Sequence, residues 1–325
     1  MFSREVLAFD APQVARDIEE AIRRQALAFR RRGAVLGVSG GIDSAVVSTL
    51  CTRALGKDRV LALFLPERDS ADESEQYGRK LTDALGIEAR TENIAGILAA
   101  AGCYDRQTEA IRKVFPEYGE GYKNKIVLPS ILKNDRLNIS ELTIESPSGE
   151  QKTARLPLEA YLQLVAATNF KQRVRKMMEY YHADRLNYLV AATPNRLEYD
   201  QGFFVKVGDG AGDIKPIAHL YKSQVYALAA FLGVPKEILN RQPTTDTFSL
   251  AQSQEEFYFA LPYEKMDLCL YGLNHGVPAA EVAPAVGLTP EQVERVFRDI
   301  EQKRRTTRYL HHKPVLAVPV PEIDV

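Results

Sequence analysis

The sequence predicts an α/β protein built around a doubly wound parallel sheet. Short apolar runs alternate along the chain with segments of helical periodicity, which is typical of a parallel sheet covered by helices on both faces. A glycine turn joins the first apolar run to the helical segment after it. Hydrophobic residues make up 45% and charged residues 26% of the 325 residues, so the chain has ample material for a hydrophobic core.

The first expected strand is the apolar run AVLGV at residues 34–38. It leads through Ser39, Gly40 and Gly41 into a helix expected at residues 43–55, which opens with polar residues. The same pattern of apolar run and helical segment recurs further along the chain. The remaining strands are expected at residues 60–65, 87–94 and 188–192, and the remaining helices at residues 70–85, 169–182 and 222–232.

The N-terminal segment is expected to form an amphipathic helix that packs on the domain after it. Its apolar face carries Val14, Ile18, Ile22 and Leu27. Charged residues interrupt this segment, so it lacks the apolar block of a signal peptide, and no later run is long enough to span a membrane. The three cysteines match neither a disulfide framework nor a zinc site, which favours a reducing, cytoplasmic location.

A region at about residues 96–167 interrupts the alternation, and we expect it to be an insertion in a single domain that spans residues 1–325. Polar and apolar residues alternate over residues 137–158 around a Pro-Ser-Gly turn at residues 147–149. This pattern predicts a β-hairpin. After Gly233 the chain is expected to be mainly helical as far as Lys303 and then extended.

The segment after the first expected strand has the features of a phosphate-binding loop. Gly40 and Gly41 allow the backbone to approach a phosphate closely, and the amides that open the following helix can donate to it. Ser39 and Ser44 add hydroxyl donors, whereas Asp43 would need a Mg²⁺ between its carboxylate and the phosphate. The loop has neither the lysine of the Walker loop nor the spacing of the dinucleotide fingerprint.

The pattern S-G-G-x-D-S after a first strand resembles the loop of the ATP pyrophosphatase superfamily, whose members cleave ATP between the α- and β-phosphates. This resemblance implies an adenine nucleotide alpha-hydrolase-like fold. Residues 191–235 resemble more narrowly the core signature of the NAD synthetase family, in its ammonia-dependent type. The segments at residues 65–74, 169–175 and 242–267 resemble the same family.

The resemblance implies that the chain amidates deamido-NAD, which is nicotinic acid adenine dinucleotide, to NAD. The nicotinate carboxylate would attack the α-phosphate of ATP, and ammonia would then displace AMP from the acyl-adenylate. The implied catalytic residues are Asp43, Glu198 and Lys222, of which Asp43 and Glu198 would hold Mg²⁺. The implied ATP-binding residues are Gly37, Val38, Ser39, Gly40, Gly41, Ile42, Asp43, Ser44, Thr193, Lys222 and Thr244, and the implied dinucleotide-binding residues are Arg173, Lys206, Asp213, His312 and Lys313.

The family also implies a homodimer, with the dinucleotide site at a two-fold interface. No glutaminase segment is recognisable, because only about thirty residues precede the first expected strand. Ammonia is therefore expected to come free or from a separate chain. The formal net charge of -1 gives no reason to expect a nucleic acid or an anionic membrane as a partner.

Two alternatives stay open. Ala192 and Pro194 flank Thr193 where the family usually has other residues, so the chain could be a related enzyme that amidates a different carboxylic acid. The other alternative is a tRNA-modifying or regulatory ATP-binding protein. A helix-turn-helix pattern at residues 279–301 is too acidic in its second helix to favour binding to nucleic acid, and packing within the fold is the better interpretation.

Overall fold

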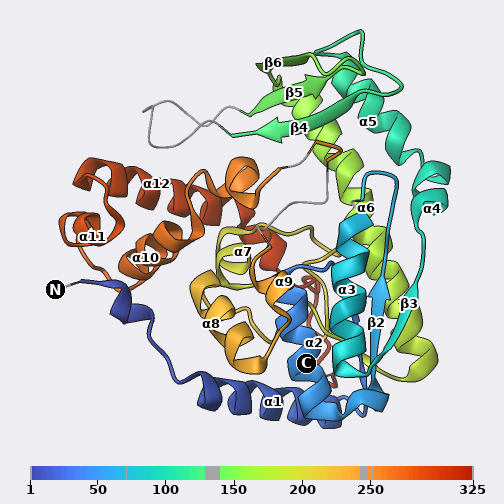
Figure 1. Cartoon of the computed structure of the whole chain (residues 1–325), viewed down its shortest axis with the longest axis vertical. Helices are drawn as coiled ribbons and strands as arrows, with labels where there is room; N and C mark the ends of the chain where they lie inside the picture. Colours follow the sequence, from blue (N-terminus) through green and yellow to red (C-terminus); the bar gives the residue numbers. More distant parts are fainter. Residues whose placement is uncertain (1, 71, 129–139, 242–247, 251, 324–325) are drawn as a thin grey trace.

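The computed structural model describes residues 2–70, 72–128, 140–241, 248–250 and 252–323. Its centre is a four-stranded sheet with the strand order β3-β2-β1-β7. Strands β2 and β3 of this sheet are labelled in Figure 1. The strands are β1 (Ala34–Gly37), β2 (Val60–Phe64), β3 (Glu88–Thr91) and β7 (Leu189–Val190). All neighbouring pairs are parallel, and Ala34 lies opposite both Val60 and Leu189. The predicted doubly wound parallel sheet is therefore confirmed.

Alternate side chains of the central strands pack into two different hydrophobic cores. Leu36 and Ala62 belong to one core, whereas Val35 and Leu61 belong to the other, because successive side chains of a strand point to opposite faces. The first core includes side chains of α1 (Ala11–Ala28), α2 (Ile42–Leu55), α3 (Asp72–Leu85) and α8 (Lys222–Leu232). The helices of the second core are α4 (Ala95–Ala100), α5 (Cys103–Arg112) and α6 (Leu158–Leu186).

Helix α1 has the expected amphipathic character, with one correction. Its N-cap Asp10 accepts a hydrogen bond from the Gln13 amide at 2.9 Å, and Ile18 and Ile22 are buried against the first core. Leu27, which was expected on the same face, is 80% exposed. Ala26 is buried in its place, because it continues the spacing of four residues that Ile18 and Ile22 begin.

Helix α6 is much longer than the helix predicted at residues 169–182, since it already begins at Leu158. Its apolar side chains enter two different cores along its length. Leu164 packs under the small sheet of the insertion, whereas Val174 and Ala183 pack under the main sheet. The buried face therefore changes along the helix, and a single apolar periodicity could not reveal the N-terminal part.

The region from residue 96 to 167 contains the predicted hairpin. Strand β5 (Glu141–Glu145) pairs antiparallel with β6 (Gln151–Arg155), and β4 (Lys123–Val127), which the sequence analysis did not predict, pairs with β5. Residues 137–139 of the predicted hairpin lie outside the described residues. The small sheet lies at the top of Figure 1, beside the first turns of α6, and has its own core with α5.

The chain after α8 is mainly helical, as expected. Its helices are α9 (Lys236–Leu239), α10 (Tyr263–Asn274), α11 (Ala279–Val286) and α12 (Pro290–Thr307). Helices α10, α11 and α12 share a third core with α7 (Arg196–Gln201) and with Phe2 near the N-terminus, whereas Ile238 of α9 is buried in the first core. Val282 of α11 and Val293 of α12 are buried there. Within the described ranges, no helix is both long and apolar enough to cross a membrane.

Candidate active site

The predicted phosphate-binding loop lies at the carboxyl end of β1, where α2 begins. Gly40 has a φ of +71°, and a Cβ atom there would lie 2.3 Å from the Ser74 carbonyl oxygen, so only glycine fits without a shift of α3. The Ser44 hydroxyl donates to the Gly41 carbonyl at 3.0 Å and accepts from the Ser39 amide at 3.3 Å. In the part of the chain that the structure describes, no side chain caps α2, which leaves its first amides for an anion.

A cavity of about 770 Å³ opens beside this loop. Strands β2 and β3 lie on one side of β1 and β7 lies on the other, and ligands of open α/β sheets bind where the strand order reverses in this way. The loop therefore faces the place where the topology favours a ligand. The predicted residues that line the cavity are Gly37, Val38, Ser39, Gly41, Ile42, Asp43, Ser44, Thr193, Glu198 and Lys222.

Asp43, Glu198 and Lys222 come together at this switch point. The buried Lys222 ammonium donates to Asp43 Oδ2. Asn195 connects the two acids, because its Nδ2 donates to Asp43 Oδ1 at 3.2 Å and its backbone amide donates to Glu198 Oε2 at 3.0 Å. Gln254 Nε2 donates to Glu198 Oε1 at 3.1 Å. The carboxylates that follow β1 and β7 in the chain thus share one wall of the cavity.

The electrostatics of this cluster fit a divalent cation. Burial and the negative charge of Asp43 raise the pKa of Glu198 to about 8, although Lys222 opposes the rise. Two carboxylates thus share a single lysine, and Mg²⁺ would supply the missing positive charge. Mg²⁺ commonly takes only one or two protein carboxylates together with substrate phosphates.

The position of Lys222 depends on a residue that the sequence analysis did not assign. Asp267 of α10 accepts hydrogen bonds from the amides of Lys222 at 3.1 Å and Ser223 at 2.7 Å. It therefore caps α8 from a distant part of the chain. Burial raises the pKa of Asp267 to about 6, even though these hydrogen bonds oppose the rise. Asp267 is the last residue of the segment at residues 242–267 that resembles the family. This resemblance is the one feature of the sequence that could have pointed to Asp267.

Other unassigned residues also line the cavity. Lys176 and Glu179 form a buried ion pair at 2.6 Å in its wall. Their spacing of three residues along α6 could have predicted this contact, because residues three apart on a helix are neighbours. Asp209, within the Gly-Asp-Gly motif, accepts from the Val205 amide at 2.7 Å, and burial raises its pKa. Arg241 lines the cavity as well and donates to the Ser39 carbonyl at 3.4 Å.

The predicted dinucleotide-binding residues are not among the described residues that line the cavity. Arg173 Nε donates to the Lys206 carbonyl at 3.4 Å, and Lys206 Nζ donates to the Tyr309 carbonyl at 2.9 Å. Asp213 Oδ2 accepts from the Val190 amide at 2.7 Å, while His312 and Lys313 are exposed. Of the predicted ATP-binding residues, Gly40 packs against α3 and is not among the described lining residues, and Thr244 lies outside the described residues.

The fold and the cavity define a doubly wound α/β protein with a cavity beyond the carboxyl ends of its strands, which is where open α/β sheets bind ligands. A family model described as NAD synthase matches residues 14–115 and 130–309. The chain therefore belongs to the NAD synthase family, as the resemblance implied.

Individual relatives agree with this assignment. An NH₃-dependent NAD⁺ synthetase from Mesorhizobium japonicum is 59% identical over 318 residues, which cover 98% of this chain and 100% of the relative. The enzyme of the same name from Rhizobium meliloti is 55% identical over 324 residues, which cover 100% of this chain and 97% of the relative. A solved structure of an NMN synthetase from Francisella tularensis has the same fold, with a TM-score of 0.62 and 22% identity over 96% of this chain and 100% of that chain.

Proposed function

We propose that this chain uses ATP and ammonia to amidate deamido-NAD to NAD, with release of AMP and pyrophosphate. The observation that carries this proposal is the cluster of Asp43, Glu198 and Lys222 beside the Ser-Gly-Gly loop. The relatives that match this chain over nearly its whole length are NH₃-dependent NAD⁺ synthetases. The same reaction follows from the resemblance of residues 191–235 to the family signature.

In the first step, a carboxylate oxygen of the substrate forms a bond to the α-phosphorus of ATP, and the bond to pyrophosphate breaks. Two anions must approach each other, so the site must compensate their charge. Lys222 is placed to act as a point charge on the departing pyrophosphate, and the loop and the first amides of α2 would bind its oxygens. Mg²⁺ held by Asp43 and Glu198 would add charge stabilisation at the phosphates.

In the second step, the ammonia nitrogen bonds to the acyl carbon of the adenylate, a proton leaves the nitrogen, and AMP departs. The aromatic residues Phe203, Phe204, Phe257 and Tyr258 line the cavity together with Glu198. Such side chains exclude water, which would otherwise hydrolyse the acyl-adenylate. This arrangement supports transfer to ammonia over hydrolysis.

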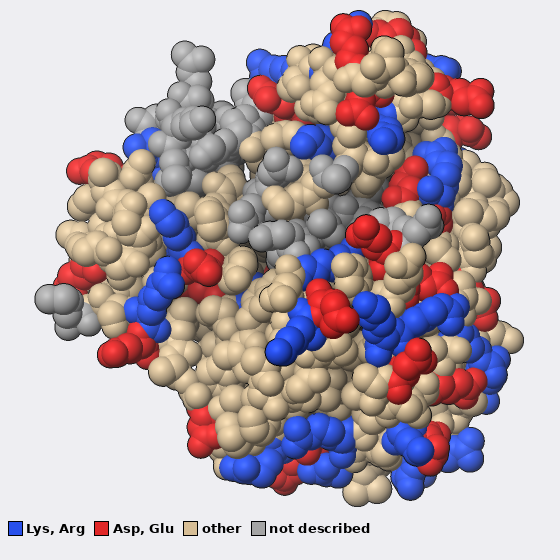
Figure 2. Space-filling model, viewed as in Figure 1, with Lys and Arg blue, Asp and Glu red and all other residues tan. Residues whose placement is uncertain are grey.

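The alternative is that the same chemistry acts on a different carboxylic acid. The fold alone does not choose between acids, because an NMN synthetase shares it. The 59% identity to an NH₃-dependent NAD⁺ synthetase favours deamido-NAD. Basic and acidic side chains intermingle on the face shown in Figure 2, which gives no support to the tRNA-modifying alternative, since nucleic-acid binders usually gather basic residues on one face.

The experiment that tests this proposal measures pyrophosphate and amide formation by the purified chain. ATP, Mg²⁺ and ammonium are supplied with deamido-NAD, with nicotinic acid mononucleotide or with neither acid, and glutamine replaces ammonium in a parallel series. We expect deamido-NAD and ammonium to give NAD and one pyrophosphate per NAD. A clear preference for the mononucleotide would establish the alternative acid. Efficient use of glutamine without an added partner chain would refute direct use of ammonia.

We also propose that the chain forms a homodimer and works in the cytoplasm. Arg173, Met177 and Tyr181 are all exposed on one face of α6, at a spacing of four residues. A second copy on this face would cover the two apolar side chains and bring Arg173 to the interface. The cytoplasmic location is supported by Cys51, Cys103 and Cys269, which are all buried free thiols.

A further inference from the structure

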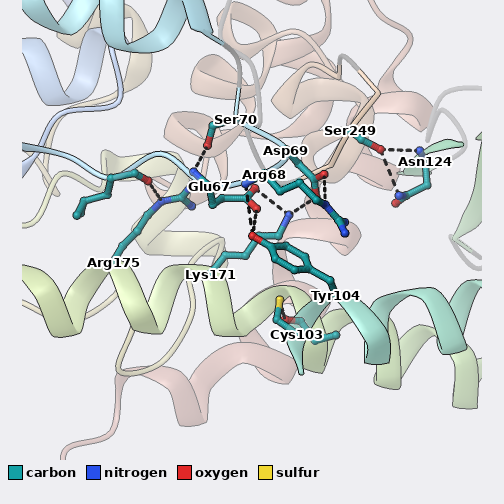
Figure 3. Close-up of polar contacts among 12 residues, drawn as sticks. Glu67, Arg68, Asp69, Ser70, Cys103, Tyr104, Asn124, Lys171, Arg175 and Ser249 are labelled. Atoms are coloured by element: carbon teal, nitrogen blue, oxygen red, sulfur yellow. Dashed lines mark hydrogen bonds and ion pairs between the residues drawn. The ribbon is translucent and has the colours of Figure 1, made fainter. Parts of the chain in front are cut away.

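A buried ion cluster joins the loop that follows β2 to α5 and α6 (Figure 3). Lys171 of α6 donates to Glu67 Oε1 at 3.0 Å and to Asp69 Oδ2 at 2.7 Å. The side chains of Lys171 and Glu67 are 0% exposed and that of Asp69 is 6% exposed. Ions so deeply buried are costly unless their charges are balanced and their hydrogen bonds are satisfied.

Arg68 of the loop balances the charge of the cluster, and Tyr104 of α5 completes its hydrogen bonds. Arg68 pairs with Asp69 at 3.1 Å, so two positive and two negative charges meet. Tyr104 of α5 donates to Glu67 Oε2 at 3.0 Å and accepts from the Arg68 amide at 3.4 Å, and its ring lies 3.9 Å under the Arg68 guanidinium. Burial alone would raise the pKa of Asp69, but Lys171 and Arg68 outweigh it and lower that pKa.

These contacts fix the loop that follows β2, residues 66–70. The Ser70 hydroxyl accepts from the Glu67 amide at 3.1 Å, which closes the loop on itself. Glu67, Arg68 and Ser70 line the cavity, whereas Lys171 and Tyr104 are not among its lining residues. Lys171 and Tyr104 therefore contact the wall of the cavity through this loop.

The position of this loop indicates which part of the ligand it contacts. The phosphate loop follows β1, the catalytic carboxylate Glu198 lies on the β7 side, and β2 is the neighbour of β1 on the opposite side. With pyrophosphate on the phosphate loop and the acid substrate approaching from the β7 side, the β2 side is left for the adenosine of ATP. Leu63, Leu65 and Asn93 line the cavity there.

We infer that Lys171 and Tyr104 are positioning residues for ATP, because they hold the loop at residues 66–70 in the shape that receives the nucleoside. This inference rests on the proposed function, since it takes ATP as the ligand of the cavity. It connects the insertion to the nucleotide site, because Tyr104 belongs to α5 and Lys171 lies in the part of α6 just beyond the insertion.

The test compares the dissociation constant of ATP, measured by calorimetry with Mg²⁺ present, in Lys171→Met, Tyr104→Phe and wild type. Lys113→Met is the matched control, because Lys113, at the C-cap of α5, forms an exposed ion pair with Glu159 of α6 at 2.5 Å. We expect ATP binding to weaken about tenfold or more in Lys171→Met and about threefold in Tyr104→Phe, since misplacement of a binding loop is costly. The control should bind ATP as the wild type does.

Steady-state kinetics separate positioning from a general effect on the fold. The KM for ATP should rise in parallel with the dissociation constant, while kcat at saturating ATP and the KM for the acid should change less than about threefold. A lowered melting temperature in folded Lys171→Met, with ATP affinity unchanged, would overturn the inference. If Lys171→Met does not fold, the same measurements on Tyr104→Phe and Asp69→Asn test the inference: weaker ATP binding by the folded variants supports it, and unchanged ATP binding overturns it. Failure of the wild type to bind ATP would instead refute the proposed function.

Discussion

At the scale of single residues, the site depends on a shortage of positive charge around two acids. Asp43 and Glu198 share Lys222, and Asn195 donates to both of them. The chain therefore positions the acids without neutralising them fully. We interpret this arrangement as preparation for Mg²⁺ bound to ATP, which carries the remaining charge into the site.

We predict that Asp43→Asn and Glu198→Gln each slow the formation of AMP by about a hundredfold or more, because a metal that stabilises the developing phosphate charge lowers the activation barrier by several kcal/mol. Both changes remove a charge and nearly preserve shape, so the fold should persist. Single-turnover AMP formation at saturating Mg²⁺ measures the effect, with circular dichroism as the control for folding. A near-wild-type rate in either folded variant would rule out its assignment as a metal ligand.

The pKa of Glu198 makes a second prediction about pH. Its value of about 8 lies above the ordinary 4.5, so without metal the folded protein retains a proton that the unfolded chain loses above pH 4.5. This contribution to stability is present below pH 4.5 and is lost as the pH rises through about 8. Mg²⁺ must displace the same proton, so its affinity should increase as the pH rises from 6 to about 8 and then level off.

Calorimetric titration of Mg²⁺ into the ATP complex across this pH range checks the prediction. Glu198→Gln is the control, because an amide has no proton to displace. Its Mg²⁺ affinity should be weaker and much less dependent on pH. A wild-type affinity that is constant between pH 6 and 8 would contradict the raised pKa.

At the scale of elements, the site is assembled at the ends of β1, β2 and β7 and is supported by helices from distant parts of the chain. Asp267 of α10 caps α8 below Lys222, and α5 and α6 hold the loop after β2. The hairpin of β5 and β6 is different. None of residues 141–155, all of which the structure describes, lines the cavity. The apolar side chains of the hairpin pack against α5 and α6 instead.

We therefore predict that replacement of residues 141–155 by a short Gly-Ser linker lowers stability but leaves ATP binding and pyrophosphate release largely intact. The flanking residues are already adjacent, because the Leu156 amide donates to the Ser140 carbonyl at 3.0 Å. Loss of the buried Leu142 and Ile144 removes apolar burial of about 1.5–3 kcal/mol each. Thermal unfolding and an ATP titration are the measurements, and complete loss of ATP binding by a folded variant would refute this placement.

At the scale of the whole molecule, Asp43, Glu198 and Lys222 line one cavity, whereas Arg173 and Lys206 are not among its described lining residues. The two residues contact each other on the surface, and Met177 is 52% and Tyr181 is 58% exposed on the same face of α6 as Arg173. A dimer through this face would explain why Arg173 and Lys206 lie away from the cavity of their own chain, and why two apolar side chains are exposed beside Arg173. The role of Arg173 and Lys206 in binding the dinucleotide stays a prediction.

We predict that Met177→Glu with Tyr181→Glu shifts the protein to monomer and raises the KM for deamido-NAD about tenfold or more, because two charges would have to be buried at the interface. ATP binding should change little. Light scattering at micromolar concentration reports the assembly, and exposed Leu27→Glu on α1 is the control. A wild-type protein that is monomeric and fully active would exclude the dimer.

The sequence by itself determined the central part of this protein. Residues 34–44 predicted β1, the phosphate loop and α2, because a buried strand, a glycine turn and a polar helix start are local signals. Glu198 and Lys222 were implied by the resemblance of residues 191–235 to the family signature, and both line the cavity together with Asp43.

Only the tertiary structure decided the features that depend on residues far apart in the chain. The length of α6 was hidden because its buried face passes from one core to another. Asp267, Tyr104 and Lys171 gave no local signal of their contacts with α8 and with the loop after β2. Burial and charge pairing are fixed by packing between distant segments, and the periodicity of a single segment does not contain that information.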